Sequence, residues 1–317
     1  MLYKKTKIIA GNSNKILAQE LEKQMEIELT KVDIDKFPNG EKRIRIKEDL
    51  SDDLVFVLQS LVEPVDEMLM ELLLLVDACR NSGAKRIVAV IPWLGYSAQD
   101  KIFRPGEPLS ARLVAKLIKS AGVQEVILLE THSPLNQKYF QEIGLEVKVL
   151  NAVDIFVDLL AQKIKKQRRE WSVLCIDKGA LERSKTLAEK LGLQLIKLKK
   201  DRDLNTGKVT FADFTDDLDG KKVISFDDFV STGFSLIKSC EIIKNLGVRY
   251  YLICIAHGVL VNRAWEKIQR SRIDKIWLSN SYPIPEKKRI AKFRIISCAG
   301  LIAQTIKNVI KKKNQKG

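Results

Sequence analysis

One stretch of the sequence places two acidic side chains directly after a short apolar run. Residues 223–235 read VISFDDFVSTGFS, in which Asp227 and Asp228 are followed by two apolar residues and a turn rich in hydroxyl groups. The apolar run predicts a strand, and the pattern over 237–245 predicts a helix. Adjacent carboxylates after a strand suit the hydroxyl groups of a sugar or a bound divalent cation.

The turn that follows the two acids has the composition of a phosphate-binding loop. A loop between a strand and a helix offers free backbone N–H groups at the positive end of the helix dipole. The hydroxyls of Ser231, Thr232 and Ser235 add further donors. Gly233 lets the backbone approach a ligand closely. The simpler alternative is an ordinary strand-to-helix connection with turn and N-cap chemistry. A Walker A loop is excluded, because its Gly-x-x-x-x-Gly-Lys-Ser/Thr spacing is absent.

Length and composition predict a globular, cytoplasmic protein of two domains. A chain of 317 residues suggests two domains of ordinary size. Its 45% hydrophobic and 30% charged residues are typical of a soluble protein, and no apolar run is long enough for a membrane span or a signal peptide. The five cysteines form no CxxC pair and several lie in apolar runs, as reduced core residues of a cytosolic protein do. A zinc site is therefore not expected.

The net charge of +15 is compatible with nucleic acid, an anionic membrane or small polyanionic substrates as partners. The basic residues are spread along the chain, except for a cluster at the tail formed by Lys311, Lys312, Lys313 and Lys316. Because the sequence has no recognition-helix, zinc or aromatic-basic RNA motif, nucleic-acid binding is not expected. Membrane binding is not expected either.

Segments with strand and helix periodicity alternate along most of the chain. In the first half the predicted strands are 7–10, 29–34, 41–46, 54–59, 86–91 and 125–129, and the predicted helices are 15–24, 65–82 and 110–121. Such alternation predicts an α/β fold in which helices cover both faces of mainly parallel sheets.

The second half of the sequence repeats the first. Residues 118–135 and 243–260 match at a constant offset of 125, with six of eighteen positions identical. The two histidines of the sequence, His132 and His257, occupy the same position of this repeat. The segments KRIVAVIPWLGYS and KKVISFDDFVSTG match at an offset of 136, so the first half carries about eleven extra residues in the loop QDKIFRPGEPL. This pattern indicates two copies of one α/β domain.

The chain resembles the ribose-phosphate pyrophosphokinases, also called phosphoribosyl-diphosphate synthetases, over nearly its whole length. The matched motifs are FPNGE at 37–41, YSAQDKIFRPGEPLSARLVAKLI at 96–118, His132, IDKGALERSKTLAEKLG at 176–192, LKKDR at 198–202, and Ser231-Thr232-Gly233. The Ser-Thr-Gly order is most similar to the archaeal-type branch of that family.

The resemblance implies two duplicated type I phosphoribosyltransferase-like domains. Residues 1–150 would form the ATP-side domain, joined by a C-terminal helix at 300–312, and residues 151–299 the domain with the ribose 5-phosphate loop. The implied reaction transfers the diphosphate group of MgATP to the anomeric hydroxyl of ribose 5-phosphate. The products would be 5-phosphoribosyl 1-diphosphate and AMP, for nucleotide biosynthesis.

The resemblance also implies a role for each matched residue. Lys200 and Arg202 would be catalytic, closing over the transferring group from a flexible loop. His132 and Asp177 would hold Mg²⁺, which takes few protein ligands and many phosphate oxygens. The ATP-binding residues would be Phe37, Asn39, Glu41, Gln99, Asp100, Lys101 and His132. The residues that bind ribose 5-phosphate would be Asp227, Asp228, Ser231, Thr232, Gly233, Phe234 and Ser235.

The family's adenine-binding motif implies an oligomer. Phe37 would stack on adenine, and Asn39 and Glu41 would bind its edge. In the family these three residues reach in from a neighbouring subunit, so the resemblance implies a homo-oligomer, a dimer or higher.

The sequence departs from the family pattern at four positions. Ala98 stands where the family has an Arg that contacts ATP, and Lys101 where many members have a second Arg. A lysine cannot reproduce a bidentate guanidinium. Phe234 replaces a small residue of the phosphate loop, and Ile176 replaces a Pro.

These departures leave two other hypotheses open. One is a non-catalytic regulatory paralogue that binds nucleotide, and the other is a nucleic-acid-binding regulator on a phosphoribosyltransferase fold, suggested by the net charge. Single motifs also have simpler interpretations. The run KLKKDR is typical of a solvated face, FPNGE of a turn before an edge strand, and His132 of a structural histidine after a buried strand.

Overall fold

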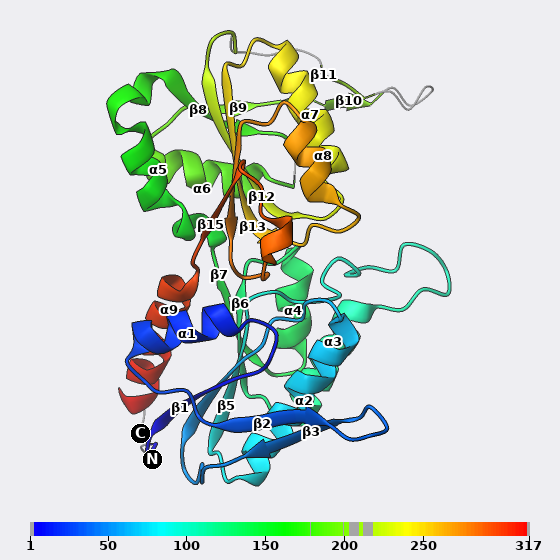
Figure 1. Cartoon of the computed structure of the whole chain (residues 1–317), viewed down its shortest axis with the longest axis vertical. Coiled ribbons are helices and arrows are strands. Elements are labelled where there is room, and N and C mark those ends of the chain that lie inside the picture. Colours follow the sequence, from blue (N-terminus) through cyan, green and yellow to red (C-terminus); the bar gives the residue numbers. More distant parts are fainter. Residues whose placement is uncertain (1–2, 178, 199, 203–208, 212–217, 316–317) are drawn as a thin grey trace. The chain divides into compact units, whose positions relative to one another are not determined.

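The structure, a computed structural model, describes residues 3–315 except 178, 199, 203–208 and 212–217 (Figure 1). Of residues 200–202, 209–211, 314 and 315 it describes the backbone alone. The chain divides into two compact units, each built around one sheet. The first unit comprises Met1–Asn151, Ser281–Pro283 and Ser297–Gly317, and the second comprises Ala152–Asn280 and Ile284–Ile296. Within the described ranges, no helix is both long and apolar enough to cross a membrane.

Five parallel strands form the sheet of the first unit, in the order β1-β4-β5-β6-β7. They are β1 (Thr6–Ala10), β4 (Leu54–Leu58), β5 (Arg86–Ile91), β6 (Glu125–Leu129) and β7 (Glu146–Leu150). Strands β4 and β6 are buried at every residue. Their continuous apolar sequences are what a parallel strand needs when helices cover both of its faces.

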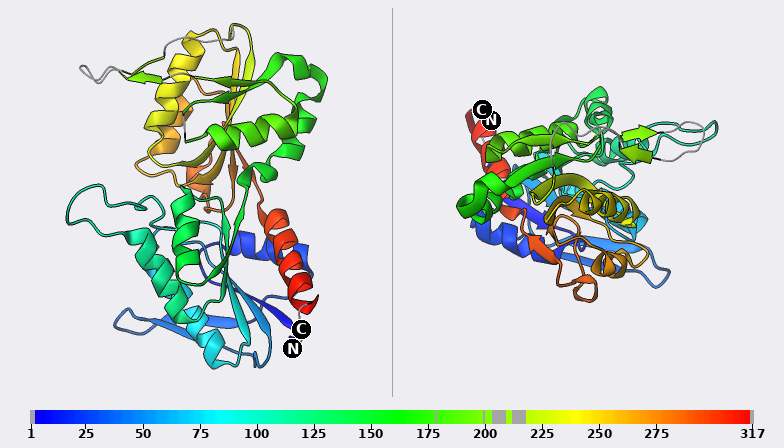
Figure 2. Two further views of the ribbon diagram at one scale, coloured as in Figure 1. Left: turned by 180° about the vertical axis from the view of Figure 1, so that it is seen from behind. Right: turned by 90° about the horizontal axis from the view of Figure 1, so that it is seen from above.

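Helices cover both faces of this sheet because its connections proceed in two directions. The crossovers from β4 to β7 all run one way, so right-handed connections place α2, α3 and α4 on one face. Helix α1 instead leads to Leu29, which bridges Ile8 at the outer edge of β1, and α1 therefore lies on the opposite face. Figures 1 and 2 show α1 side by side with α9, against which it packs. The helices are α1 (Lys15–Met25), α2 (Val65–Asn81), α3 (Ser110–Ala121), α4 (Pro134–Glu142) and α9 (Ala299–Gln315).

A two-stranded antiparallel hairpin, β2 (Val32–Lys36) and β3 (Lys42–Ile46), lies beside α2 in the first unit. One face of the hairpin is apolar and packs against the core with Val32, Ile34, Ile44 and Ile46. The other face is charged: both Asp35–Arg43 hydrogen bonds measure 2.8 Å and are exposed. The alternation of the two strands therefore fixes which side of the hairpin meets α2.

An ionic cluster links the end of α9 to the first residues of β5 and β7, at the amino edge of the sheet. Lys313 Nζ lies 2.8 Å from Glu146 Oε2, and Arg86 Nη2 lies 2.7 Å from Glu146 Oε1. Partial burial by itself raises the pKa of Glu146, but hydrogen bonds from Lys313 and Arg86 outweigh it and lower this pKa to about 2. A carboxylate with a lowered pKa stabilises the fold above its ordinary pKa, and this contribution is lost as the pH falls toward about 2.

We expect Glu146→Gln to be destabilised relative to the wild type at neutral pH, and the difference in stability to shrink as the pH falls below about 4.5. Because the Glu146 side chain is 52% exposed, the difference in free energy of unfolding should be only about 1 kcal/mol. Urea unfolding of both proteins between about pH 7 and pH 3.5 measures this difference. A difference that stays constant or grows toward low pH would contradict the prediction.

The sheet of the second unit has six parallel strands in the order β15-β14-β13-β12-β8-β9. They are β8 (Trp171–Cys175), β9 (Leu195–Lys197), β12 (Lys222–Val230), β13 (Tyr250–Gly258), β14 (Lys275–Ser279) and β15 (Phe293–Ile296). A separate antiparallel pair consists of β10 (Lys200–Arg202) and β11 (Val209–Phe211). The helices are α5 (Val157–Ile164), α6 (Leu181–Leu191), α7 (Phe234–Asn245) and α8 (Ala264–Arg270), with 3₁₀ segments η1 (Ala152–Ile155), η2 (Lys165–Glu170) and η3 (Glu286–Lys288).

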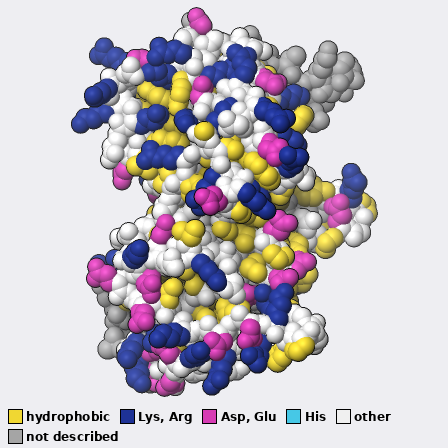
Figure 3. Space-filling view, in the orientation of Figure 1, with side chains coloured by type: hydrophobic (Ala, Val, Ile, Leu, Met, Phe, Trp, Pro, Cys, Tyr) yellow, Lys and Arg dark blue, Asp and Glu magenta, His cyan; other side chains and the backbone are white. Residues whose placement is uncertain are grey.

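The predicted α/β fold class and internal duplication are confirmed. The repeated elements are β5, α3 and β6 in the first unit and β12, α7 and β13 in the second, and β5 and β12 begin at Arg86 and Lys222. The extra residues of the first copy lie between β5 and α3. On the face drawn in Figure 3, Lys and Arg side chains are scattered among Asp and Glu side chains on both units.

Several details of the predicted elements were wrong. The strand expected at 29–34 lies at Val32–Lys36. The strand expected to end before the acids continues to Val230, because Asp227 pairs with Ile255 of β13 and further pairs follow it. Helix α7 begins at Phe234, three residues earlier than predicted. The segment that carries Lys200 and Arg202 was expected to be a loop, but its backbone pairs with β11, whose Val-Thr-Phe sequence favours a strand.

Candidate active site

The second unit has a topological switch point between β8 and β12. From β8 the chain crosses through α6 to β9 on one side, and from β12 it crosses through α7 to β13 on the other. The connections after these two adjacent strands therefore diverge to opposite faces and leave a crevice at the carboxyl edge of the sheet. Ligands of open α/β sheets bind in such crevices.

A pocket of about 270 Å³ occupies this crevice. Its lining residues are Asp177, Asp227, Asp228, Phe229, Val230, Ser231, Thr232, Gly233, Phe234, Ser235 and Leu236. The structure thus brings together all seven residues that the sequence assigned to ribose 5-phosphate, and it adds the predicted metal ligand Asp177.

The loop at 231–233 has the conformation of an anion-binding turn before a helix. Gly233 adopts a left-handed conformation with φ of 74°, which a side chain at this position would strain. The backbone N–H groups that follow the turn lie at the start of α7, where the helix dipole is positive. Phe234 is 70% exposed, so its ring projects away from the turn and its backbone N–H is what the turn positions.

The two acids differ in their surroundings. The pKa of Asp227 is raised to about 8 by burial and by the neighbouring charges of Asp228 and Asp177. Asp228 Oδ2 lies 3.6 Å from Arg183 Nη2, and both side chains are largely buried. A cluster of three carboxylates is therefore held together at the pocket with one nearby arginine.

These oxygen ligands are suited to a hard divalent cation. Asp177 Oδ1 accepts a hydrogen bond from Ala180 N at 3.0 Å, which fixes the carboxylate at the start of α6. Among the described residues no group of three or more His, Cys, Asp or Glu side chains is arranged to enclose a metal. Mg²⁺ does not need such an enclosure, because substrate phosphates and water complete its octahedral shell.

In the first unit, Gln99, Asp100 and Lys101 lie in the long connection between β5 and α3. Gln99 N donates to Tyr96 O at 3.0 Å, which closes a turn, and Tyr96 has a left-handed φ of 64°. The side chains of Gln99 and Lys101 are exposed. Asp100 is buried, accepts a hydrogen bond from Ser133 Oγ, and its backbone carbonyl accepts one from Tyr139 at 2.7 Å. The buried carboxylate of Asp100 therefore links this loop to the next one.

His132 lies in that next loop, between β6 and α4, and its side chain is exposed. Ser133, directly after it, caps α4 by accepting a hydrogen bond from Leu135 N. The bond between Ser133 and Asp100 thus ties His132 to the loop of Gln99 and Lys101. His257, its counterpart in the repeat, is buried inside β13.

The structure gathers Phe37, Asn39 and Glu41 at the turn of the hairpin β2–β3. Phe37 N donates to Glu41 O at 2.8 Å, and Asn39 Oδ1 accepts from Glu41 N at 3.2 Å. The Phe37 ring is 45% exposed. The hairpin projects to the side of the first unit, away from the carboxyl edge at which β5 and β6 end (Figures 1 and 2). The three residues predicted to bind adenine, Phe37, Asn39 and Glu41, are therefore not grouped with His132 within one unit.

The predicted catalytic pair is only partly described. The backbones of Lys200 and Arg202 belong to β10, two positions apart on one strand. Their side chains lie outside the described residues.

Sequence reasoning missed Arg183, the partner of Asp228. Its Nη1 also donates to Gly179 O at 3.2 Å, so it links the connection after β8 to the acids of β12. The available signal was an arginine in the first turn of the helix that follows Asp177. Helix first turns more often carry acids.

Comparison with known proteins agrees with this architecture. Residues 6–122 match the family described as the N-terminal domain of ribose phosphate pyrophosphokinase, and residues 147–288 match the phosphoribosyl transferase domain. The chain is 36% identical over 304 residues to a ribose-phosphate pyrophosphokinase of Aquifex aeolicus, covering 96% of this chain and 95% of that protein. It is 35% identical over 309 residues to that of Bacillus caldolyticus, covering 97% and 96%. The crystal structure of phosphoribosylpyrophosphate synthetase from Mycobacterium smegmatis matches with a TM-score of 0.87 and 29% identity, over 98% of this chain and 100% of that one.

Both units therefore have the phosphoribosyltransferase type of fold, with the acid pair and hydroxyl turn of that class in the second unit. The sequence identity to the two ribose-phosphate pyrophosphokinases is above 30% over nearly the whole length of each chain, so a particular family within this class can be named. The chain belongs to the ribose-phosphate pyrophosphokinase family.

Proposed function

We propose that this chain transfers the diphosphate group of MgATP to the anomeric hydroxyl of ribose 5-phosphate, releasing AMP and 5-phosphoribosyl 1-diphosphate. The observation that carries the proposal is the pocket at the switch point of the second unit. It combines a hydroxyl-lined turn at the start of α7 with two strand-borne acids. A turn suited to phosphate and two acids suited to hydroxyl groups line one small pocket, and this combination supports a sugar phosphate as the acceptor.

The acceptor is held by its two ends. The N–H groups and hydroxyls of Ser231, Thr232 and Ser235 bind the 5-phosphate at the positive end of α7. Asp227 and Asp228 accept hydrogen bonds from the ribose hydroxyls, with Arg183 holding Asp228 in place. Binding at both ends would fix the orientation of the anomeric hydroxyl.

The donor side draws on residues of the first unit. Gln99, Lys101 and His132 contact the nucleotide, and Asp100 fixes the two loops that carry them. Phe37, Asn39 and Glu41 bind adenine from the hairpin of a neighbouring subunit, so the working form is a homo-oligomer. We place the reaction in the cytoplasm, where all five buried cysteines remain reduced thiols.

The donor set fits Mg²⁺ because its protein ligands are carboxylate oxygens and an imidazole. Asp177 and His132 would hold the ion. When bound, Mg²⁺ supplies positive charge to the diphosphate oxygens during the transfer. Lys200 and Arg202 add further positive charge where negative charge develops on the leaving oxygen of AMP.

AMP formation tests the proposed function directly. Purified protein with ATP and Mg²⁺ should produce AMP only when ribose 5-phosphate is added, with 5-phosphoribosyl 1-diphosphate formed in equal amount. Phosphate release without AMP, or AMP formation independent of the sugar, would sink the assignment. No turnover under any of these conditions would favour the non-catalytic paralogue.

We expect Ala98→Arg to keep activity and to lower the KM for ATP. Ala98 is exposed, so a longer side chain has room, and a guanidinium adds bidentate donors for phosphate oxygens. A gain of about 1.5–3 kcal/mol for a hydrogen bond to a charged group sets the upper limit of the effect. Steady-state kinetics with ATP as the varied substrate measures it, with Ala98→Gln as an uncharged control. A large loss of kcat would mean that the pocket is built around Ala98.

A further inference from the structure

A buried carboxylate, Glu71 of α2, lies at the centre of a polar cluster in the first unit. Its side chain is fully buried. Its Oε1 accepts hydrogen bonds from Asn12 N at 2.6 Å and from Gln59 Nε2 at 3.0 Å, and its Oε2 lies 2.7 Å from Lys42 Nζ. We call these four residues the Glu71 network. A buried carboxylate is costly unless it is paired and hydrogen-bonded, so each of these partners is required.

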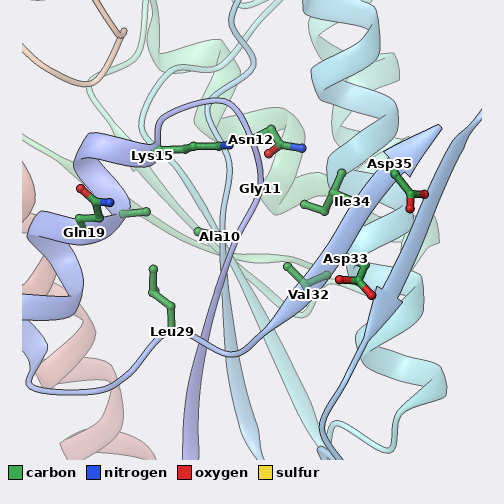
Figure 4. A pocket seen from close by; sticks show the side chains of 11 residues that line it. Ala10, Gly11, Asn12, Lys15, Gln19, Leu29, Val32, Asp33, Ile34 and Asp35 are labelled. Carbon is green, nitrogen blue, oxygen red and sulfur yellow. The ribbon is translucent and has the colours of Figure 1, made fainter.

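The Glu71 network lies at the switch point of the first sheet. Asn12 follows β1 and Gln59 follows β4, at the carboxyl ends of the two strands from which the chain departs in opposite directions. Gly11 is needed here because a Cβ would lie 2.3 Å from Gln59 Oε1 and 2.8 Å from Glu71 Oε1. Figure 4 shows Gly11 and Asn12 on the loop after β1, facing Ile34 of β2 across a pocket of about 560 Å³.

Lys42 connects this network to the hairpin β2–β3, whose turn carries Phe37, Asn39 and Glu41. Lys36 and Lys42 are directly opposite each other on β2 and β3, and they flank the turn at 37–41. They share the hairpin face that packs on α2, because they continue the alternation of Ile34 and Ile44. The turn is therefore held at both of its ends by lysines that reach toward α2.

Two glutamates one helical turn apart receive these lysines. Lys36 Nζ lies 2.9 Å from Glu67 Oε2, and Lys42 Nζ lies 3.7 Å from the same atom and 2.7 Å from Glu71 Oε2. The Lys36 and Glu67 side chains are 50% and 44% exposed, whereas those of Lys42 and Glu71 are 9% and 0% exposed. An exposed pair is screened by water and contributes little, but breaking a buried pair leaves an uncompensated charge. The Lys42–Glu71 pair is therefore the one that fixes the turn.

We propose that Lys42 and Glu71 are positioning residues for nucleotide binding. Their buried ion pair holds the turn with Phe37, Asn39 and Glu41 in a fixed position relative to α2. It thereby fixes the position from which the turn reaches the adenine bound to a neighbouring subunit, and so sets the affinity for ATP. The inference rests on the proposed function for the role of the turn, but the ion pair and its geometry do not depend on it. Rigid support of this kind matters because a misplacement of about 1 Å in a positioning group can cost on the order of 10²-fold in rate.

Lys42→Met tests the proposal, because methionine keeps the length of the side chain and removes its charge. We expect the KM for ATP to rise at least about tenfold, with kcat and the KM for ribose 5-phosphate changed less than about threefold. Lys42→Arg should recover most of the ATP affinity. Lys36→Met, which removes the exposed pair on the opposite strand, is the matched control and should leave the KM for ATP unchanged. An unchanged KM for ATP in Lys42→Met, or an equal rise of both KM values, overturns the proposal.

A second measurement covers the case in which Lys42→Met unfolds. The double variant Lys42→Met/Glu71→Gln removes the unpaired buried charge but keeps an acceptor oxygen for Asn12 N and Gln59 Nε2. It should restore the melting temperature, yet its KM for ATP should stay raised. A double variant with wild-type KM for ATP would show that the pair serves stability alone.

Hydrogen exchange of the substrate-free protein separates this proposal from the proposed function. The amide of Phe37, which closes the turn, should exchange roughly tenfold faster in the double variant and at the wild-type rate in Lys36→Met. Equal exchange in all three proteins overturns the positioning role even if the enzyme makes AMP. If the wild type makes no AMP but the Phe37 amide still exchanges faster in the double variant, the positioning of the turn is supported and only the assigned reaction is refuted.

Discussion

Lys200→Ala and Arg202→Ala should each lower kcat by roughly 10²–10⁴-fold, with much smaller changes in KM. The backbones of both residues lie on β10, two positions apart. Cations that meet the transferring diphosphate only as charge develops stabilise the transition state more than the bound substrates. Removing one of them therefore affects turnover before affinity.

Lys197→Ala is the matched control for these two variants. Lys197 ends β9 in the same basic segment, and its side chain is exposed. Its loss should change kcat less than about threefold, as expected for a solvated charge. If all three variants turn over like the wild type, the segment is a solvated face and the catalytic assignment is wrong.

Asp227→Ala and Asp228→Ala should each abolish or severely weaken the use of ribose 5-phosphate while the protein stays folded. Each acid would hydrogen-bond a ribose hydroxyl. Such a bond contributes about 0.5–1.5 kcal/mol when both groups are neutral and about 1.5–3 kcal/mol when one is charged. The corresponding loss in kcat/KM for the sugar phosphate is about 10–10²-fold or more for each bond to a charged acid. Replacing either acid relieves part of the charge repulsion that, together with burial, raises the pKa of Asp227 to about 8. Asp228→Ala also removes an ion-pair partner of the largely buried Arg183, so a lower melting temperature is expected for that variant.

Circular dichroism and the KM for ATP serve as controls for the acid variants, because neither should change. Asp158→Ala provides a carboxylate control on α5, outside the residues that line the pocket. Wild-type affinity for ribose 5-phosphate in both acid variants would show that the pocket binds something else.

The fold was predictable because its strands have strong, simple patterns. Residues Leu54–Leu58, and the four residues after Glu125, are continuous apolar runs of the kind expected for a parallel strand that is covered on both faces. The constant offset of the repeat then allowed the same elements to be predicted in the second unit. The end of β12 was less predictable. The acids that look like a loop sequence remain in the strand, because β13 runs beside them and its register with Ile255 and His257 extends the ladder.

The grouping of the seven residues assigned to ribose 5-phosphate was predictable because they lie within one short stretch of the sequence. One strand, one turn and the start of one helix supply all seven, so local sequence determines their grouping. Arg183 and Lys42 were not predictable in the same way. Each acquires its role from a partner far along the chain, Asp228 or Glu71, and single surface-type lysines and arginines carry no local signal of such a partner.

The packing of α9 against α1 has a consequence for how the polypeptide is made. Leu17 and Leu21 of α1 and Ile306 of α9 are fully buried, so the first unit is completed by residues that are synthesised after the whole second unit. All strands of the second unit are synthesised before α9, so that unit can fold while the first still lacks a helix. At about 5–20 residues per second, the first unit waits on the order of ten seconds with this apolar face uncovered. A premature stop near residue 300 would therefore destabilise the first unit rather than the second. We also expect the nascent chain to bind chaperones during that interval.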